Sequence, residues 1–211
     1  CRRCTHCLVL ARLRADLARN VFGIPEGKLR VISPDMGGGF GMRGSPFVEH
    51  ALVLWAARRT GRPVRFTATR SEALASDYHA RDNVSRAALA LDADGKFLGL
   101  KGSTDAALGG YLSNSGPHSP TNNLGGLSGV YTTPHVHVEA RGVFTHTSPT
   151  ATYRGAGRPE ASYGLERLID ASAYDLGIDP VELRRRNLIP NDALPYDTGF
   201  IFTYDSGDFT G

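Results

Sequence analysis

The hydrophobic positions of this 211-residue chain change their spacing several times, and each spacing predicts a different kind of element. In three segments, apolar residues recur at helical spacing and a glycine suited to a helix end follows: 10–21, 46–60 and 159–176. Asp179, followed by Pro180 and Glu182, predicts the capped start of a fourth helix that ends near residue 188. Residues 71–77 predict a short helix or turn.

Strand-like runs with alternating or β-branched apolar residues occupy five segments: 29–33, 64–69, 83–91, 96–108 and 136–146. An Asp-Gly pair between the third and fourth runs predicts a hairpin. Residues 109–128 are rich in Gly, Ser, Asn and Pro and predict a long loop that is either functional or mobile. Strands and helices mix without strict alternation, so the predicted fold class is α+β, with a mixed sheet and packed helices.

Composition places the chain among ordinary soluble globular proteins, since 41% of its residues are hydrophobic and 21% are charged. A formal net charge of +3 with interspersed signs gives no electrostatic reason to expect nucleic acid as a partner. No apolar run is long enough for a membrane span. The chain starts with Cys and ends in a polar stretch, so we interpret it as an internal fragment: an atypical end at 1–12, one domain at 13–190, and a linker at 191–211 toward a second domain.

All three cysteines, Cys1, Cys4 and Cys7, lie in the first seven residues. Their C-x-x-C-x-x-C spacing is typical of an iron–sulfur ligand run, but such a cluster normally needs a fourth cysteine. His6 would suit a zinc site instead. We favour a third interpretation, an aberrant fragment end. The lack of further cysteines excludes a disulfide scaffold.

The first motif with candidate chemistry is the run DMGGGFG at 35–41, directly after the strand-like segment 29–33. A tight turn alone would explain its glycines. A phosphate-binding Walker A loop would need Lys and Ser or Thr where Met42 and Arg43 follow, and the dinucleotide fingerprint has a different glycine spacing. The remaining functional interpretation is a loop whose amides approach a ligand closely, with Phe40 as an apolar cover.

The second motif is the run ATYRGAGRPE at 151–160, directly before the predicted helix 159–176. Arg154 lies among small residues near free N–H groups at a helix start. Such an arginine suits an anion or oxyanion site. Pairing of Arg154 with a surface carboxylate is an equally good interpretation of this motif taken alone.

Together, the two motifs resemble the large subunit of the xanthine dehydrogenase/aldehyde oxidase family of molybdenum hydroxylases, which includes aerobic carbon monoxide dehydrogenase. The resemblance covers roughly residues 14–210 and corresponds to the first molybdopterin-binding domain of that subunit. Further stretches fit the same family: GRPV at 61–64, DGK at 94–96, VY at 130–131, LRRRN at 183–187 and YDSGD at 204–208.

The resemblance implies a molybdenum–molybdopterin cofactor, with the cytosine dinucleotide form as an alternative, and no protein ligand to the metal, which the pterin holds. In that family the amides of the glycine loop approach an oxo ligand of molybdenum. Here this implies Phe40 and Gly41, with Gly38 and Gly39 permitting the approach. Arg154 stands where the family has an arginine over the metal site.

The implied activity is hydroxylation of an electron-poor carbon with oxygen from water, in which Arg154 is catalytic and stabilises negative charge on the substrate oxygen. The family's catalytic Glu lies near the end of the large subunit, outside this chain, so we assign no general base and set Glu49 and Glu160 aside. Implied partners are the remainder of the large subunit, an iron–sulfur subunit and an FAD subunit, in the cytoplasm.

Departures from the family pattern narrow the substrate. Arg43 follows the glycine loop where purine-hydroxylating relatives carry an acid, and Ala156 replaces their Phe. Gly155 stands where the carbon monoxide dehydrogenase branch has a copper-binding Cys. With Tyr153, Gly155 and Ala156 as the expected substrate pocket, an aldehyde or a small N-heterocycle fits best. Alternatives are a carbon monoxide dehydrogenase-type subunit, a degenerate non-catalytic binding or assembly domain, and an anion-binding protein.

Two further features of the sequence allow more than one interpretation. The histidines form no pair at metal-ligand spacing on a helix, so we expect polar surface or core roles for them: His79, His118, His135, His137 and His146. The loop 109–128, which contains Tyr111, Asn114 and His118, would line a substrate funnel or be a plain surface loop.

Overall fold

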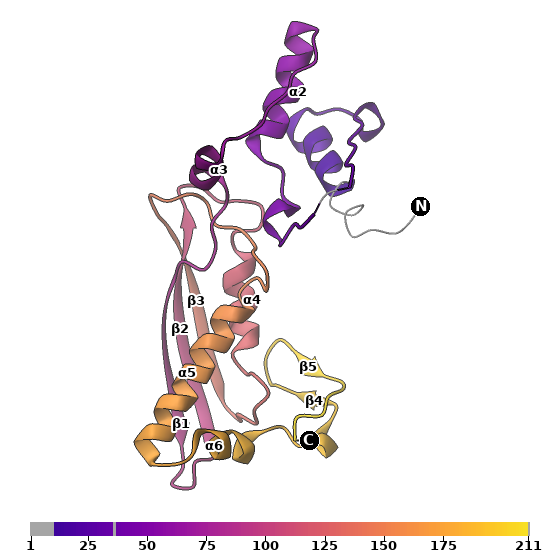
Figure 1. The fold of residues 1–211 in the computed structure, drawn as a ribbon. Coiled ribbons are helices and arrows are strands. Elements are labelled where there is room, and N and C mark those ends of the chain that lie inside the picture. The colour runs from indigo at the N-terminus through magenta and orange to yellow at the C-terminus, as the bar shows by residue number, and fades with distance from the viewer. Residues whose placement is uncertain (1–10, 36, 211) are drawn as a thin grey trace. The chain divides into compact units, whose positions relative to one another are not determined.

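A computed structural model describes residues 11–35 and 37–210, and the chain divides into two compact units, Cys1–Tyr78 and His79–Gly211. The cysteine-rich start falls outside the described residues. Each unit is described by itself (Figure 1). Among the described residues, no helix has the length and hydrophobicity that crossing a membrane requires.

The first unit is mainly helical. Residues 11–15 form an α-helix that continues as the π-helix η1 (Asp16–Val21), which confirms the helix predicted over 10–21 from residue 11 onward. The predicted helix 46–60 is α2 (Val48–Thr60), and Gly61 ends it in the left-handed conformation. The other elements of this unit are two 3-10 turns and a short helix: η2 (Glu26–Lys28), η3 (Met42–Gly44) and α3 (Arg70–Ser76).

The strands predicted at 29–33 and 64–69 are wrong, because the structure assigns no strand to either segment. A strand requires a hydrogen-bonded neighbour, and no described residue pairs with the backbone of 30–32 or 64–68. Side chains that the pattern placed toward a core remain exposed, with Ile32 at 69% and Phe66 at 52% of their possible surface. Both segments therefore have a strand-like sequence pattern, but among the described residues neither has a neighbouring strand to pair with.

The second unit contains a mixed three-stranded sheet in the order β1-β2-β3. β1 (Asn83–Leu91) and β2 (Phe97–Gly109) form the predicted antiparallel hairpin, whose turn is closed by bonds to Asp92. β3 (Val136–Phe144) runs parallel to β2 along its other edge. Antiparallel and parallel pairing in one sheet, covered by helices, confirms the predicted α+β class.

Two predicted helices follow in this unit, and α5 (Arg158–Leu176) packs on the sheet while α6 (Pro180–Asn187) packs against α5. α5 buries a stripe of residues four positions apart, namely Ala161, Leu165, Ile169 and Ala173. α6 starts as predicted, since the Asp179 carboxylate accepts the amides of Val181 and Glu182. The core joins these helices to the strands through the following buried residues: Phe97, Leu100, Leu127, Tyr131, Ala161, Leu165, Ile169, Ala173 and Leu183.

The predicted loop 109–128 is only partly a loop, because it contains the helix α4 (His118–Gly126). α4 and α5 lie side by side on the sheet (Figure 1). The buried residues of α4 include Ser119, Asn123 and Gly125, and all three residue types have a poor intrinsic helix propensity. Tertiary packing overrides that propensity, because only small residues allow α4 to approach its neighbours closely.

The segment after Pro190 contains η4 (Asn191–Ala193) and a two-stranded ribbon of β4 (Tyr196–Asp197) and β5 (Thr203–Tyr204). The Tyr204 hydroxyl donates a hydrogen bond to the Gly129 carbonyl at 2.6 Å, so the ribbon is fastened to the second unit. The interpretation of 191–211 as a linker toward a second domain stays a prediction.

One buried side chain ties the hairpin turn to α6. Asn187 has no exposed surface; its Oδ1 accepts the Phe97 amide at 2.8 Å, and its Nδ2 donates to the carbonyls of Gly95 and Leu183. Nearby, Arg184 pairs with Glu166 and Asp170 of α5. Burial, together with the bond to Glu166, raises the pKa of Tyr131 to about 12, so this hydroxyl stays protonated and donates.

Replacing Asn187 by Leu should destabilise the unit strongly. The change strands the buried Phe97 amide and Gly95 carbonyl without partners, at a cost of about 2–4 kcal/mol in the free energy of unfolding. Urea unfolding measures the loss. Asn114→Leu, at an exposed position, is the matched control and should change little; equal effects of the two variants would contradict the role given to Asn187.

Candidate functional site

The first glycine loop is held in an unusual backbone conformation. Gly38, Phe40 and Gly41 all have positive φ, at 64°, 49° and 89°. The Phe40 ring lies against Gly38, where a Cβ would come within 2.6 Å of the ring. Positive φ is costly for a residue such as Phe, and residues held in this way concentrate at functional sites. Gly38 is therefore favoured here by its conformation and by the Phe40 ring, and Gly41 by its conformation.

The same loop leaves part of its backbone open. A Cβ at Gly37 or Gly39 would meet nothing within 4 Å. The loop is closed by its later residues, with the Arg43 amide donating to the Gly39 carbonyl. Within the described residues, the amides of Gly38, Gly39 and Gly41 donate no hydrogen bond to protein. This side of the loop can present N–H groups to an anionic or oxo ligand.

The second loop turns through three consecutive residues with positive φ: Gly155 at 94°, Ala156 at 46° and Gly157 at 98°. The Ala156 amide donates to the Tyr153 carbonyl at 2.6 Å and the Arg158 amide donates to the Gly155 carbonyl at 3.1 Å. This tight turn delivers the chain directly into the first turn of α5.

Both glycines of this turn are packed against protein. A Cβ at Gly155 would lie 2.6 Å from the Pro159 ring, and a Cβ at Gly157 would overlap the Ser119 carbonyl of α4. Tyr153 and Arg154, by contrast, are exposed. The turn is therefore wedged between α4 and α5 while the side chains that precede it face outward.

The predicted site residues fall into two groups. Gly38, Gly39, Phe40 and Gly41 belong to the first unit, whereas Tyr153, Arg154, Gly155 and Ala156 lie together in one turn of the second unit.

Arg81 is a residue of this turn's surroundings that sequence reasoning missed. Its Nη2 donates to the Arg154 carbonyl at 2.5 Å, and its Nη1 pairs with the Glu160 carboxylate at 2.8 Å. Its guanidinium carbon also lies 5.5 Å from the centre of the Tyr153 ring. No glycine, periodicity or spacing marks Arg81 in the sequence, so only the fold reveals these contacts. Glu160, set aside as a base, serves here as the partner of an arginine.

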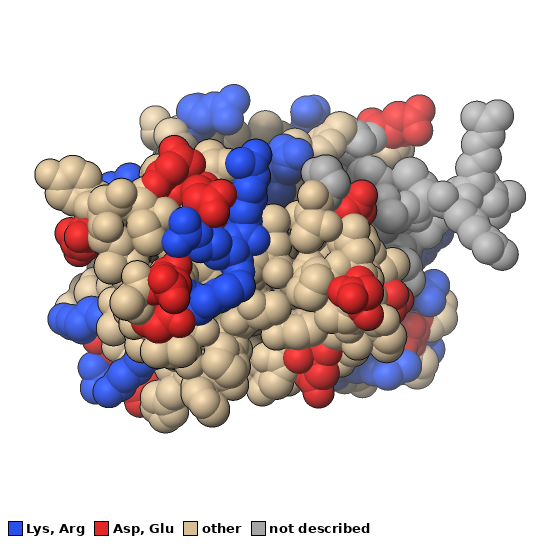
Figure 2. All heavy atoms as spheres, turned by 90° about the horizontal axis from the view of Figure 1, so that it is seen from below, with Lys and Arg blue, Asp and Glu red and all other residues tan. Residues whose placement is uncertain are grey.

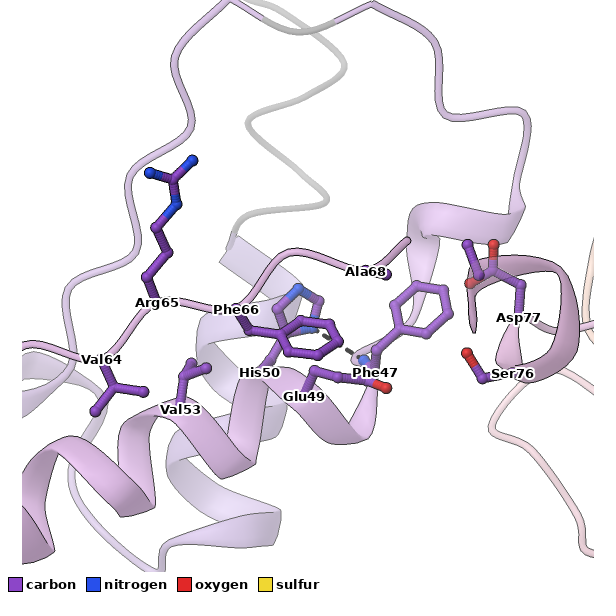
Figure 3. A pocket seen from close by; sticks show the side chains of 11 residues that line it. Phe47, Glu49, His50, Val53, Val64, Arg65, Phe66, Ala68, Ser76 and Asp77 are labelled. Carbon is purple, nitrogen blue, oxygen red and sulfur yellow. Dashed lines mark hydrogen bonds between the residues drawn. The ribbon is translucent and has the colours of Figure 1, made fainter. Parts of the chain in front are cut away.

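A cavity of about 470 Å³ lies at the start of α2 in the first unit (Figure 3). Figure 3 shows Phe47 and Phe66 in its wall, with the Arg65 side chain directed away. His50 Nδ1 accepts a hydrogen bond from the Phe47 amide at 3.0 Å. Burial lowers the pKa of His50 and so favours the neutral imidazole, although the nearby Glu49 carboxylate acts in the opposite direction. The cavity contains none of the predicted site residues.

Charges and metal-ligand groups point to no separate site. On the face that Figure 2 shows, basic and acidic residues lie interleaved among uncharged ones. In the part of the chain that the structure describes, no three His, Cys, Asp or Glu side chains are grouped so as to hold a metal ion.

Comparisons with known proteins agree on one family. The sequence matches the molybdopterin cofactor-binding domain over residues 5–188. It is 34% identical to the 6-hydroxypseudooxynicotine dehydrogenase complex subunit gamma of Paenarthrobacter nicotinovorans, and 37% identical to the carbon monoxide dehydrogenase large chain of Hydrogenophaga pseudoflava. Each match covers 89% of this chain and 24% of the relative, so the chain spans about a quarter of their length.

A solved structure supports the same assignment. Quinoline 2-oxidoreductase from Pseudomonas putida 86 superimposes with a TM-score of 0.87 at 32% sequence identity, over 96% of this chain and 26% of that protein. At this identity, the likeness extends beyond the fold to the sequence.

Substitution of Gly157 by Ala tests the wedged turn. The added methyl would overlap the Ser119 carbonyl at a φ of 98°, so we expect a loss of roughly 2–4 kcal/mol in the free energy of unfolding. Gly164→Ala is the matched control in the same helix, because a Cβ there meets nothing within 4 Å and should stabilise α5 by up to about 1 kcal/mol. Thermal or urea unfolding of both variants decides; a harmless Gly157→Ala would show that the turn is not constrained.

Proposed function

Because the chain belongs to the molybdopterin cofactor-binding domain family of the molybdenum hydroxylases, we propose that it forms part of the molybdenum-binding large subunit of such an enzyme. The subunit would oxidise an aldehyde or a small N-heterocycle with oxygen derived from water. The observation that carries the proposal is that, in a chain of this family, the Gly38, Gly39 and Gly41 amides of the first glycine loop donate to no acceptor among the described residues.

The residues of that loop fit the cofactor. Gly37 and Gly39 leave open space, and the amides of Gly38, Gly39 and Gly41 have no acceptor among the described residues. Bare amides of this kind suit negatively polarised oxygen atoms, which a molybdenum–molybdopterin group carries. We propose that Gly38, Gly39, Phe40 and Gly41, with Arg154 from the second loop, hold that group. The cytosine dinucleotide form of the cofactor is part of the same proposal.

When bound, the cofactor supplies hydroxylation of an electron-poor carbon and accepts the two electrons released. The chain's own residues would position the reacting groups and stabilise charge. The Phe40 and Gly41 amides would donate to a negatively polarised oxygen, and the exposed Phe40 ring would exclude water beside them. Arg154 would stabilise negative charge that develops on the substrate oxygen, an effect that is strongest where water is excluded.

The residues around Arg154 suit a substrate other than a purine or carbon monoxide. Ala156 provides no aromatic wall, and Gly155 offers no thiolate for copper. Tyr153 is 42% exposed, and we propose that this exposed part of the side chain forms one side of the pocket. Two relatives, named for 6-hydroxypseudooxynicotine and quinoline, support a heterocycle-sized substrate. A carbon monoxide dehydrogenase-type subunit is the second candidate, favoured by the 37% identity to that enzyme's large chain.

The proposal includes partners. One relative is a subunit of a dehydrogenase complex by name. We propose that the remainder of the large subunit completes the site and that iron–sulfur and FAD subunits carry the electrons onward, in the cytoplasm.

Replacement of Arg154 by Ala in the complete large subunit, purified with its partners, tests the catalytic role. Turnover should fall by about a hundredfold or more, as for removal of other groups that stabilise an oxyanion. Molybdenum content, measured by mass spectrometry, should stay near that of the unchanged subunit. If metal and activity fall together, the role of Arg154 is structural. If the subunit without any substitution contains no molybdenum when it is made in a host that produces the cofactor, a degenerate binding domain is favoured instead.

Replacement of Gly39 by Ala tests the open side of the first loop. A Cβ at Gly39 meets nothing within 4 Å of protein and requires no strained φ, so folding stability should be unaffected. The methyl would instead occupy space proposed for the cofactor, so molybdenum content should fall several-fold.

Gly27→Ala is the matched control for this experiment, because its Cβ also meets open space in the same unit. It should leave both stability and molybdenum content unchanged. Full molybdenum content in Gly39→Ala would refute the placement of the cofactor at this loop.

A further inference from the structure

We propose that Arg81 is a positioning residue that fixes the main chain of Arg154 and thereby aims the Arg154 guanidinium at the substrate. The inference rests on the proposed function of Arg154, and it adds a residue that no motif of the sequence marks. It concerns the second unit alone.

The Arg81 guanidinium joins three parts of the turn. Nη2 donates to the Arg154 carbonyl at 2.5 Å, Nη1 pairs with Glu160 at 2.8 Å, and the charged group lies 5.5 Å from the centre of the Tyr153 ring. These contacts reach the residue before Arg154, Arg154 itself, and the first turn of α5. Arg81 therefore contacts the chain both before and after the bend.

The contact with Arg154 uses the main-chain carbonyl and not the Arg154 side chain. The positive charge of Arg81 is paired with Glu160, whose side chain is only 13% exposed. Glu160 therefore balances the charge of the Arg81 group that holds the Arg154 backbone.

Arg81 is itself anchored on a fixed stretch of backbone. The His79 amide donates to the Pro149 carbonyl at 3.1 Å and the Ala151 amide donates to the His79 carbonyl at 2.9 Å, so this stretch runs beside the chain entering the turn. The Ala107 amide donates to the Asp82 carbonyl at 3.0 Å, which ties the stretch to β2. The contacts of Arg81 thus link the turn to the sheet.

The backbone at Arg81 has a φ of 68°, where a non-glycine residue costs roughly 1–2 kcal/mol. Glycine would adopt this conformation freely, so stability alone does not explain an arginine here. The planar fork of arginine, with several donors in fixed directions, can serve a carbonyl and a carboxylate at once, whereas lysine offers a single charged centre. The side chain accounts for the residue at this strained position.

The test uses Arg81→Gly and Arg81→Lys in the complete subunit with its partners. Arg81→Gly removes these contacts, which leaves Glu160 without its partner, and it also relieves the strained φ. The two effects on the thermal midpoint oppose each other, so its change should be small compared with the loss of turnover. Turnover should fall by about ten- to a hundredfold with a smaller change in KM, because misplacement of a catalytic group lowers the rate more than substrate binding. Arg81→Lys should recover part of the loss by keeping the pair with Glu160.

Two readouts separate positioning from a merely structural role. Amide exchange of Ala156 and Arg158, whose bonds close the turn, should quicken in Arg81→Gly while amides of the buried α5 stripe do not. In a double-mutant cycle, Arg81→Gly should cost little further turnover once Arg154 is Ala, because both changes remove one function. Arg86→Lys, in an exposed pair with Asp105, is the matched control and should change neither readout.

Unchanged turnover in Arg81→Gly, additive losses in the cycle, or loss of activity in step with molybdenum content and thermal stability would each overturn the proposal. If Arg154→Ala alone leaves turnover intact, the proposed function of Arg154 fails. The exchange of the Ala156 and Arg158 amides, which requires no activity, then still decides whether Arg81 holds the turn.

Discussion

Close approach of α4 and α5 is the constraint on which the second loop depends. A Cβ at Gly126 would lie 3.1 Å from the Ala161 Cβ, and one at Gly157 would overlap the Ser119 carbonyl. Because the helices are this near, the chain entering α5 turns through small residues, with glycine at 155 and 157, where a Cβ would clash. The exposed position of Arg154 directly before that turn is thus a consequence of how two helices pack on the sheet.

The two glycine loops use the same residue for opposite physical reasons. In the second loop, Gly155 and Gly157 make room for neighbouring protein. In the first loop, Gly37 and Gly39 have no neighbour within 4 Å, so the missing side chains leave the backbone accessible. The first arrangement fixes a side chain in place, whereas the second exposes amides.

Local signals predicted the parts of the fold that depend on local interactions. The Asp-Gly turn between β1 and β2, the Asp179 cap of α6 and the Gly177 end of α5 all lie where the sequence places them. The runs 29–33 and 64–69 failed because a strand is defined by its partner, and the described residues supply none. α4 was missed for the reverse reason, since its Gly, Ser and Asn residues are poor helix formers that long-range packing selects.

The site divides along the same line. Both loops could be found from the sequence, because glycines and an arginine at the ends of elements leave a local pattern. Arg81 could not be found in this way, because its hydrogen bond joins residues 73 positions apart. The acceptor is also a main-chain carbonyl, which every residue type carries and which therefore leaves no mark in the sequence. Arg81 also has a positive φ, which is unusual for a residue other than glycine. A strained backbone that bears a long charged side chain, when glycine would relieve the strain, indicates that the contacts of that side chain serve a role other than net stability.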